Sequence, residues 1–258
     1  MKDTLKISIL QTDIAWEAPH ENRARLQVLL DELPQTDVAV LPETFSTGVT
    51  KQPAAVAEPP DGPTVQWLRE RAAAGNFAIT GSLVVASGGK IFNRLVWVAP
   101  DGKVQHYDKR HLFPLADEDK AYDAGSQRPT FEYLGWKIRP LICYDLRFPV
   151  WSRNDDGYHL ALYVADWPAR RKQVWRTLLQ ARALENQCFV AGCNRVGSDA
   201  YDVGFSGDSG IWDARGNILA DATPSQETVI TATLDKNELL AFRKKFAVLE
   251  DAHPFRLL

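Results

Sequence analysis

The chain has 258 residues, 45% of them hydrophobic, which is enough to bury one large core. Its formal net charge is only -3 and its basic residues are dispersed, so the charge pattern argues against a nucleic-acid partner. Composition does not divide the sequence into halves, and we expect a single domain over residues 1–258.

The sequence contains no motif for binding a metal or a phosphate and no segment that would span a membrane. The five histidines show no two-on-one-face spacing and there is no glycine-rich phosphate loop, so we expect no metal and no cofactor. Cys143, Cys188 and Cys193 are too few for a disulfide scaffold or a zinc site. No apolar run approaches the roughly 20 residues of a membrane helix, and the start lacks the apolar region of a secretory signal. These features predict a cytoplasmic protein without membrane contact.

The first part of the chain alternates short runs of Val, Ile and Leu with amphipathic stretches. Strands are predicted at 5–10, 37–41 and 77–85, and helices at 21–33 and 64–74. That order is typical of a sheet with helices on its face. Turns at Gly88-Gly89 and Asp101-Gly102 then define hairpin strands at 91–99 and 103–107. The sheet is therefore expected to be mixed, with antiparallel pairs in its middle.

The second part of the chain begins with a polar loop, predicted at 110–125. Further strands are predicted at 131–133, 137–142, 160–164, 188–193, 210–212, 218–220 and 228–234. Apolar positions at helical spacing predict a helix at 170–187. About ten strands and four or five helices suggest two layers of sheet, because a single sheet of that width tends to curl or split. The apolar tail, about 247–258, is expected to pack on the body or on a partner subunit.

The main chemical signal is a cysteine at the end of an apolar run, in Leu141-Ile142-Cys143-Tyr144-Asp145. Taken alone, such a thiol is usually a small buried hydrophobe. However, two other apolar runs also lead to an ionisable residue, Glu43 in one case and Lys109 in the other. Catalytic groups in α/β sheets gather beyond the carboxyl ends of strands. We therefore expect Glu43, Lys109 and Cys143 to meet in one pocket.

These groups together are able to attack a carbonyl. Cys143 would be the nucleophile, Glu43 the base and later the acid, and Lys109 a positive charge for the tetrahedral intermediate. The backbone N–H of Tyr144 would donate to the oxyanion. Because a carboxylate disfavours a thiolate and an ammonium favours it, the three groups should titrate as a unit. The sequence leaves open whether the resting state is a neutral thiol beside an ionised Glu43 or the proton-shifted form.

Three segments resemble the signatures of the nitrilase, or carbon–nitrogen hydrolase, superfamily. They are Leu41-Pro42-Glu43-Thr44-Phe45, Tyr107-Asp108-Lys109-Arg110-His111-Leu112-Phe113 and Ile142-Cys143-Tyr144-Asp145-Leu146-Arg147-Phe148-Pro149. The resemblance implies a four-layer αββα sandwich that forms a homodimer. It also implies a Glu-Lys-Cys triad that hydrolyses a non-peptide C–N bond through a thioester, and a supporting second glutamate at Glu118. The alternative for Glu118 is a solvated charge in a polar loop.

Within the superfamily, the segment Cys143 to Pro149 is similar to the omega-amidase branch, which hydrolyses 2-oxoglutaramate and 2-oxosuccinamate to 2-oxo dicarboxylic acids and ammonia. The partner would then be a small amide with a distal carboxylate, for which Arg147 is the candidate ligand because a guanidinium grips a carboxylate bidentately. Alternatively, Arg147 pairs with Asp145 or another structural carboxylate. Asp166 and Trp167 are further candidates for substrate binding.

Two departures from the omega-amidase pattern put the substrate in question. Asp166 stands where bacterial relatives usually have asparagine, and an ionised Asp166 would repel a substrate carboxylate unless an arginine or a proton compensates. Gly204-Phe205 replaces the usual His-Tyr. A nitrile, an N-carbamoyl amine or an aliphatic amide is the alternative substrate. A non-catalytic thiol sensor or binding protein on the same scaffold is the alternative class, although such a protein has no need of all three groups.

Overall fold

The alternating apolar runs fold into two six-stranded sheets within residues 2–253, the part of the chain that this computed structural model describes. The first sheet has the strand order β14-β1-β2-β3-β4-β5. Its strands are β1 (Thr4–Gln11), β2 (Val38–Val40), β3 (Ala78–Ser87), β4 (Lys90–Val98), β5 (Val104–Asp108) and β14 (Thr228–Asp235). The second has the order β13-β12-β9-β8-β7-β6. Its strands are β6 (Phe131–Tyr133), β7 (Trp136–Ile142), β8 (Leu160–Ala165), β9 (Phe189–Asn194), β12 (Gly210–Trp212) and β13 (Ile218–Asp221).

Both sheets are mixed, and their parallel strands lie inside them. In the first sheet, β1, β2 and β3 run parallel, while β4, β5 and β14 join the ends of the sheet as antiparallel strands. The expectation of antiparallel pairs in the middle of the sheet is therefore wrong. Long crossovers through helices place β2 beside β1 and β3 beside β2 in parallel, whereas hairpins add β4 and then β5 toward the edge. In the second sheet, β7, β8 and β9 are parallel in the same way.

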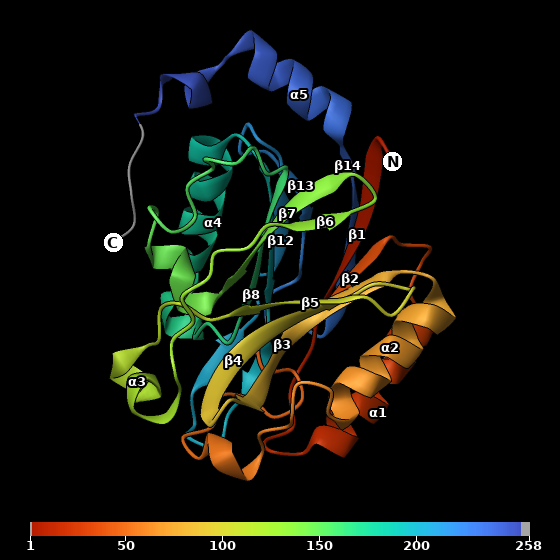
Figure 1. Cartoon of the computed structure of the whole chain (residues 1–258), viewed down its shortest axis with the longest axis vertical. Coiled ribbons are helices and arrows are strands. Elements are labelled where there is room, and N and C mark those ends of the chain that lie inside the picture. Colours follow the sequence, from red (N-terminus) through yellow and green to blue (C-terminus); the bar gives the residue numbers. More distant parts are fainter. Residues whose placement is uncertain (1, 254–258) are drawn as a thin grey trace.

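Helices cover the two outer faces, and the sheets pack against each other between them (Figure 1). Helices α1 (Pro19–Asp31) and α2 (Pro63–Gly75) bury Leu26, Leu30 and Leu68 against the first sheet. Helix α4 (Lys172–Asn186) buries Trp175 and Leu179 against the second. One apolar cluster joins inward-facing residues of both sheets. The layer order is thus helix, sheet, sheet, helix, as the αββα expectation requires.

A close approach of α4 to its sheet depends on a glycine. A Cβ atom added to Gly192 in β9 would lie 2.5 Å from Leu179 Cδ1 and 3.0 Å from Trp175 Cζ2. Real side-chain contacts are longer, so a larger residue here would push the helix outward. Since β9 leads to the cavity described below, this packing contributes to the position of the site.

Three segments differ from the predicted elements. The loop expected at 110–125 contains a 3₁₀ turn at Pro114–Ala116 and the short helix α3 (Glu118–Ala121). A small hairpin, β10 (Val196–Ser198) with β11 (Gly204–Ser206), was not predicted. Helix α5 (Lys236–Lys245) was also not predicted, and it begins at Asp235, whose side chain accepts hydrogen bonds from the backbone of Asn237 and Glu238.

The C-terminal segment packs on the body of the protein as far as it is described. Arg243 in α5 donates to the carbonyls of Gln187 and Tyr158, at 2.7 and 2.6 Å. The side chain of Gln187 in turn donates to the carbonyl of Phe246 at 2.7 Å. A 3₁₀ turn follows at Val248–Asp251, and residues 254–258 of the predicted tail lie outside the described residues. None of the helices found within residues 2–253 combines the length and apolar character needed to cross a membrane.

Candidate active site

A cavity of about 270 Å³ lies where strands from both sheets end. Four of its lining residues directly follow or closely follow a strand. Glu43 comes after β2, Lys109 after β5, Cys143 after β7 and Asp166 after β8. The structure therefore brings the three residues of the expected triad into one cavity, together with Asp166.

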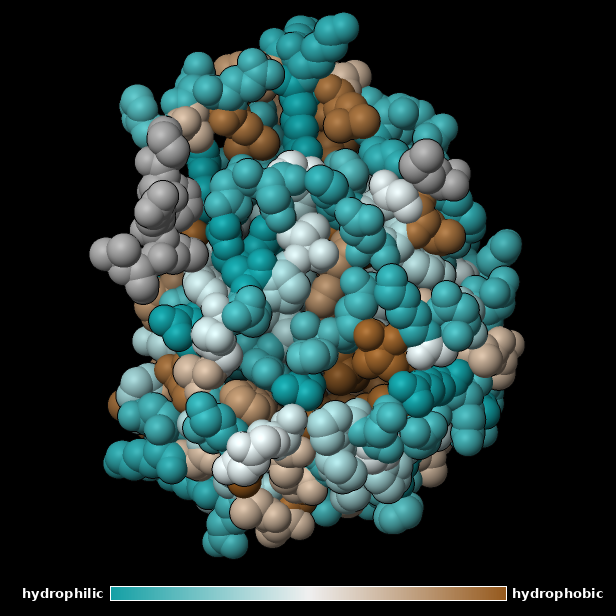
Figure 2. Space-filling view, in the orientation of Figure 1, coloured by the Kyte–Doolittle hydropathy of each residue, from teal (hydrophilic) through white to brown (hydrophobic). Residues whose placement is uncertain are grey.

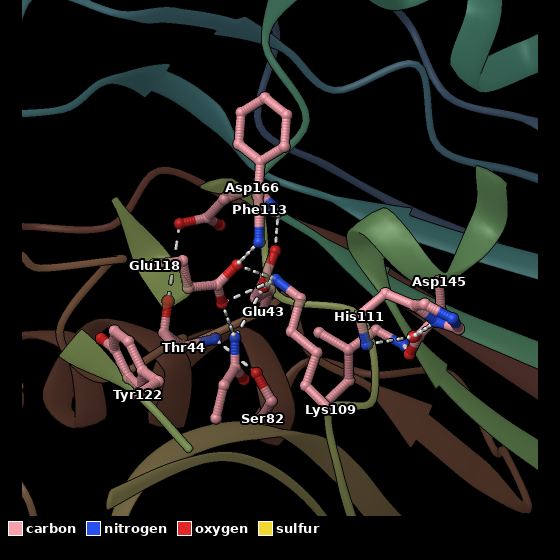
Figure 3. A network of polar contacts seen from close by, with 12 residues as sticks. Glu43, Thr44, Ser82, Lys109, His111, Phe113, Glu118, Tyr122, Asp145 and Asp166 are labelled. Carbon is pink, nitrogen blue, oxygen red and sulfur yellow. Dashed lines mark hydrogen bonds and ion pairs between the residues drawn. The ribbon is translucent and has the colours of Figure 1, made fainter. Parts of the chain in front are cut away.

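Lys109 is bound by two carboxylates at the base of this cavity (Figure 3). Its Nζ atom lies 2.8 Å from Glu43 Oε1, and 2.8 and 2.9 Å from the two carboxylate oxygens of Glu118. All three side chains are at most 3% exposed. Burial alone would lower the pKa of Lys109, but the charges of Glu118 and Glu43 outweigh it, so the pKa is raised well above its usual value. Lys109 is therefore a permanent cation.

Glu118 is held in place by the loop that carries it. Its Oε2 atom accepts a hydrogen bond of 2.7 Å from the backbone N–H of Phe113, in addition to the bonds from Lys109. Burial raises the pKa of Glu118, the charge of Lys109 opposes this, and the charge of Glu43 adds to it. The reading of Glu118 as a solvated loop charge is therefore wrong. The segment 110–125 folds over the cavity because this buried carboxylate anchors it.

The carboxylate of Glu43 receives three donors from three different elements. Lys109 and the side chain of Asn93 both donate to Oε1, at 2.8 and 2.7 Å. The backbone N–H of Asp166 donates to Oε2 at 2.7 Å. A carboxylate oxygen has room for two such partners. Oε2 therefore keeps a lone pair with which it is able to accept a proton.

Cys143 sits at a strained turn between β7 and a 3₁₀ turn at Cys143–Arg147. Its φ angle is 43°, in the left-handed region that residues with a side chain rarely adopt. The same region holds Thr44, next to Glu43, and Asp117, next to Glu118. Glu43, Glu118 and Cys143 thus each carry or adjoin a residue with a strained backbone. Such strain is typical of functional sites, where the surrounding fold enforces one orientation.

The surroundings of Cys143 disfavour the ionised form of its thiol. Burial raises its pKa well above the usual value, and the charge of Glu43 raises it further, while Lys109 opposes both. Of the two resting states that the sequence leaves open, these influences favour the neutral thiol. A base is needed before the sulfur becomes nucleophilic.

A second buried cluster fixes the turn that carries Cys143. Asp145 is fully buried, and its carboxylate accepts hydrogen bonds from the hydroxyl of Tyr107 at 2.7 Å and from the backbone of Ile142 and His111, both at 3.0 Å. The ring Nδ1 of His111 lies 2.7 Å from the same carboxylate, and its ring stacks on Phe148. With these partners Asp145 needs no arginine, so the alternative that Arg147 pairs with Asp145 is wrong.

Three arginines stand at the rim of the cavity: Arg147, Arg170 and Arg171, called the rim arginines below. None of them forms an ion pair with another of the described residues. Arg147 lies over the ring of Trp167 at 5.3 Å, and Arg171 over the ring of Phe113 at 5.2 Å. Their guanidinium groups therefore remain free to bind an anion.

The other predicted site residues also line the cavity. Tyr144 is the second residue of the 3₁₀ turn, where a backbone N–H has no acceptor within the turn. Trp167 is buried, and its indole N–H donates to the carbonyl of Arg171 at 3.0 Å, so its polar atom is already used. It contributes an apolar wall.

Asn93, Tyr107 and His111 belong to these networks but were not predicted as site residues. Asn93 lies in the middle of β4 with its side chain fully buried. Its only signal in the sequence is an amide within the otherwise apolar and basic stretch of that strand. The described residues contain no group of three or more His, Cys, Asp and Glu side chains placed to hold a metal ion.

Comparison with known proteins agrees with the arrangement of the site. A family model described as carbon-nitrogen hydrolase matches residues 6–244. The chain is 45% identical to the omega-amidase YafV of Yersinia enterocolitica, over 99% of both chains, and 46% identical to that of Escherichia coli K12, over 98% of both. It is 37% identical to the 2-oxoglutaramate amidase of Bacillus subtilis, over 95% of this chain and 96% of the relative.

Solved structures lead to the same family. A protein of the CN-hydrolase superfamily from Xanthomonas campestris, whose active site carries an arsenic adduct, superposes with a TM-score of 0.97 at 43% identity, over the whole of both chains. With a fold, a family model and full-length relatives in agreement, the chain belongs to the carbon–nitrogen hydrolase family.

Proposed function

We propose that this protein is an omega-amidase. It hydrolyses the terminal amide of small substrates such as 2-oxoglutaramate and 2-oxosuccinamate, and forms the 2-oxo dicarboxylic acid and ammonia. The observation that carries the proposal is the cavity in which Cys143, at a strained turn, shares its walls with the ion-paired Glu43, Lys109 and Glu118. The full-length similarity to omega-amidases and to a 2-oxoglutaramate amidase supports the choice of reaction.

The first half of the reaction forms a thioester. Glu43 accepts the thiol proton while the sulfur of Cys143 adds to the amide carbon, and the carbonyl electron pair moves to oxygen. Lys109 and the backbone N–H of Tyr144 stabilise the resulting oxyanion. When the carbonyl re-forms, ammonia leaves with the proton that Glu43 returns. The free lone pair on Glu43 Oε2 suits it to both transfers.

The second half returns the enzyme to its resting state. Glu43 removes a proton from water, and the hydroxyl adds to the thioester carbon. Collapse of this second intermediate releases the acid and the sulfur of Cys143, which takes the proton back. Glu118 does not touch the substrate in this scheme. It keeps Lys109 in position through the bonds of 2.8 and 2.9 Å.

The rim arginines support a substrate with a carboxylate at the end opposite its amide. A guanidinium binds a carboxylate through two parallel hydrogen bonds, and these guanidinium groups have no ion-pair partner among the described residues. Arg147 is the proposed ligand, with the rings of Trp167 and Phe113 as apolar walls. A nitrile or an uncharged aliphatic amide would leave these charges unused.

Ammonia release and the mass of the acyl group on Cys143 test the proposal together. Purified enzyme is incubated with 2-oxoglutaramate, succinamate, butyramide, a nitrile and an N-carbamoyl amino acid, and samples are quenched early for mass spectrometry. We expect turnover of the first two, with a matching acyl adduct on Cys143. Turnover of only the nitrile or only the carbamoyl compound would overturn the assignment, and a protein without turnover or adduct would be the thiol-binding alternative.

We also propose that the enzyme is a cytoplasmic homodimer built on a single domain. The resemblance to a family of dimers supports the assembly, and so do exposed apolar side chains at Val150, Leu184 and Phe246, which are 51%, 49% and 59% accessible. Brown apolar residues are also visible near α5 in Figure 2. Light scattering coupled to size-exclusion chromatography measures the assembly, and a mass of one chain would contradict the dimer.

A further inference from the structure

Of the carboxyl groups that line the cavity, those of Glu43, Glu118 and Asp166 share their surroundings with one buried ammonium, that of Lys109. Glu43 and Glu118 both bind Lys109, and each also accepts a backbone hydrogen bond. Asp166, which lines the same cavity, forms no ion pair with any other described residue. Its Oδ2 atom has one long contact of 3.5 Å with the hydroxyl of Thr44 (Figure 3). Its Oδ1 atom is buried without a hydrogen-bond partner in the described part of the chain.

These contacts do not suit an ionised carboxylate. A carboxylate has about four acceptor positions, and a buried charge without a partner costs far more than a buried neutral group. The nearest fixed negative charge, Glu43, accepts a bond from the backbone of Asp166 itself. These contacts favour a neutral, protonated Asp166.

The pKa of Asp166 is shifted upward, in agreement with its few polar contacts. Burial raises the pKa of Asp166 to about 8 and the charge of Glu43 adds to the rise, while the charges of Arg195 and Lys109 and a hydrogen bond from the backbone of Val49 oppose it. Arg195 is fully buried and binds Asp13 at 2.7 Å, so its charge is already neutralised in part. At neutral pH the carboxyl is thus mainly protonated, and it ionises within the range that enzyme assays cover.

We propose that Asp166 is a proton-controlled specificity residue, whose neutral carboxyl admits a substrate with a distal carboxylate and whose ionised form excludes that substrate while still admitting an uncharged amide. The inference rests on the proposed function and deepens it. It explains how an aspartate can stand in a cavity for anions, at the position where the omega-amidase pattern has the neutral asparagine. The rim arginines attract the substrate carboxylate, and the proton removes the opposing charge.

Other titratable groups face Asp166 from the elements around it. They are Glu43, Lys109, Glu118, Tyr122, Cys143, Cys193 and Arg195, with the rim arginines at the mouth of the cavity. The arginines keep their charge over the range concerned, and burial raises the pKa of Cys193 and of Tyr122. Ionisation of Cys143, Glu43 or Lys109 changes the chemical step for every amide. Their effects therefore cancel when two amides are compared on the same enzyme.

The test compares succinamate with butyramide, in which a methyl group replaces the distal carboxylate. The ratio of their kcat/KM values is measured from two pH units below to two above the pKa of about 8. In the unmodified enzyme we expect this ratio to fall on the order of tenfold as pH rises, because an ionised Asp166 repels only the anion. In Asp166→Asn, which has the shape of the protonated form, the ratio should not change with pH.

Asp199→Asn is the matched control. Asp199 also lines the cavity, but its carboxylate already accepts hydrogen bonds from the backbone of Tyr201 and Val203, at 2.8 and 2.9 Å. The control should keep the pH dependence of the unmodified enzyme. If the ratio has the same pH profile in the unmodified enzyme and in Asp166→Asn, the inference is wrong. Asp166→Ser is a second neutral variant, in case the asparagine variant does not fold.

Thermal unfolding separates a failure of this inference from a failure of the proposed function, because it needs no turnover. A group whose pKa is raised by folding binds more protons in the folded state, so the folded state loses stability as pH rises between the unfolded and folded pKa values. The melting temperature of Asp166→Asn should therefore exceed that of the unmodified protein by a margin that grows from about pH 4 to pH 8 and then stays constant. A margin independent of pH would overturn the inference, whether or not either amide is hydrolysed.

Discussion

The charged side chains at the base of the cavity form ion pairs, whereas the rim arginines form none with another described residue. At the base, Glu43 and Glu118 both form ion pairs with Lys109, and each of the three is at most 3% exposed. At the rim, three guanidinium groups stand without an ion-pair partner among the described residues. The same contrast appears within one turn, where Asp145 is fully buried and satisfied while Arg147, two residues later, is exposed.

The difference separates two uses of charge in one enzyme. Paired and buried charges hold atoms in fixed positions, because breaking such a pair leaves an uncompensated charge in a medium of low dielectric. Unpaired charges at a surface cost little, since water solvates them, and they are available to a ligand. Substitutions at the base should therefore affect the chemical step for all amides, whereas substitutions at the rim should affect the choice of amide. The predictions below test this division.

The largest effect is expected for Cys143→Ala. Turnover should fall on the order of 10⁵-fold or more, because the nucleophile is lost and no other described cysteine lines the cavity. The fold should be kept, since alanine removes one half-buried atom and meets the same left-handed backbone strain as cysteine. Ammonia release and the melting temperature measure the two effects.

Cys188→Ala is the matched control for this prediction. Cys188 is fully buried outside the cavity, and its sulfur has a weak contact of 3.9 Å with the carbonyl of Arg182. The control should lose some stability and keep its activity. Full activity in Cys143→Ala, or loss of activity in Cys188→Ala without unfolding, would contradict the role of Cys143.

The next effect is expected for Glu118→Gln. The amide offers Lys109 one acceptor in place of two charged ones. The ammonium therefore loses one of its hydrogen bonds and shifts relative to the substrate carbonyl. We expect kcat to fall roughly 10²-fold, as for the loss of one group that positions an oxyanion donor, with little change in KM. The free energy of unfolding should fall by about 1–3 kcal/mol, because Lys109 keeps Glu43 as a partner.

Asp119→Asn controls for the removal of a charge from the same short helix. Asp119 is exposed and adjoins Glu118 in the chain. Steady-state kinetics with the same amide should give a kcat for Asp119→Asn close to that of the unmodified enzyme. Similar kcat values for Glu118→Gln and Asp119→Asn would show that Glu118 does not position Lys109.

The sequence predicts the ends of the strands at the cavity. It does not predict the side chains that hold the residues at these ends in position. Apolar runs that stop at Glu43 and Cys143 mark strand ends directly, since the apolar pattern ends where the ionisable residue begins. The partners that hold these residues lie elsewhere in the chain. Asn93 reaches Glu43 from the middle of a hairpin strand, and no local pattern shows which buried polar group faces which.

The helices and strands that were not predicted escaped prediction for different physical reasons. The strands at Val196–Ser198 and Gly204–Ser206 have three residues each, too few to show alternation. The helix at Glu118–Ala121 depends on a tertiary ion pair with Lys109 rather than on its own sequence. For α5 the signal was present. Asp235 caps the helix, Glu238 follows three residues later and the last turn is basic, but the prediction for this end of the chain was only an apolar tail at about 247–258.

The smallest and most selective effect is expected for Arg147→Lys at the rim. Lysine keeps the charge but loses the planar fork that binds a carboxylate through two bonds, and it loses the stacking over Trp167. We expect kcat/KM for succinamate to fall about tenfold, while the value for butyramide stays nearly constant.

Arg176→Lys is the matched control, because Arg176 already binds Asp221 with two hydrogen bonds of 2.7 and 2.8 Å and does not line the cavity. It should leave both values unchanged. Equal losses for both amides in Arg147→Lys would make Arg147 a structural residue. Since Arg147 has no ion-pair partner among the described residues and Asp145 is already satisfied, such a result would have to come from its contact with Trp167 alone. The division between a base that sets the chemistry and a rim that selects the substrate would then fail at Arg147.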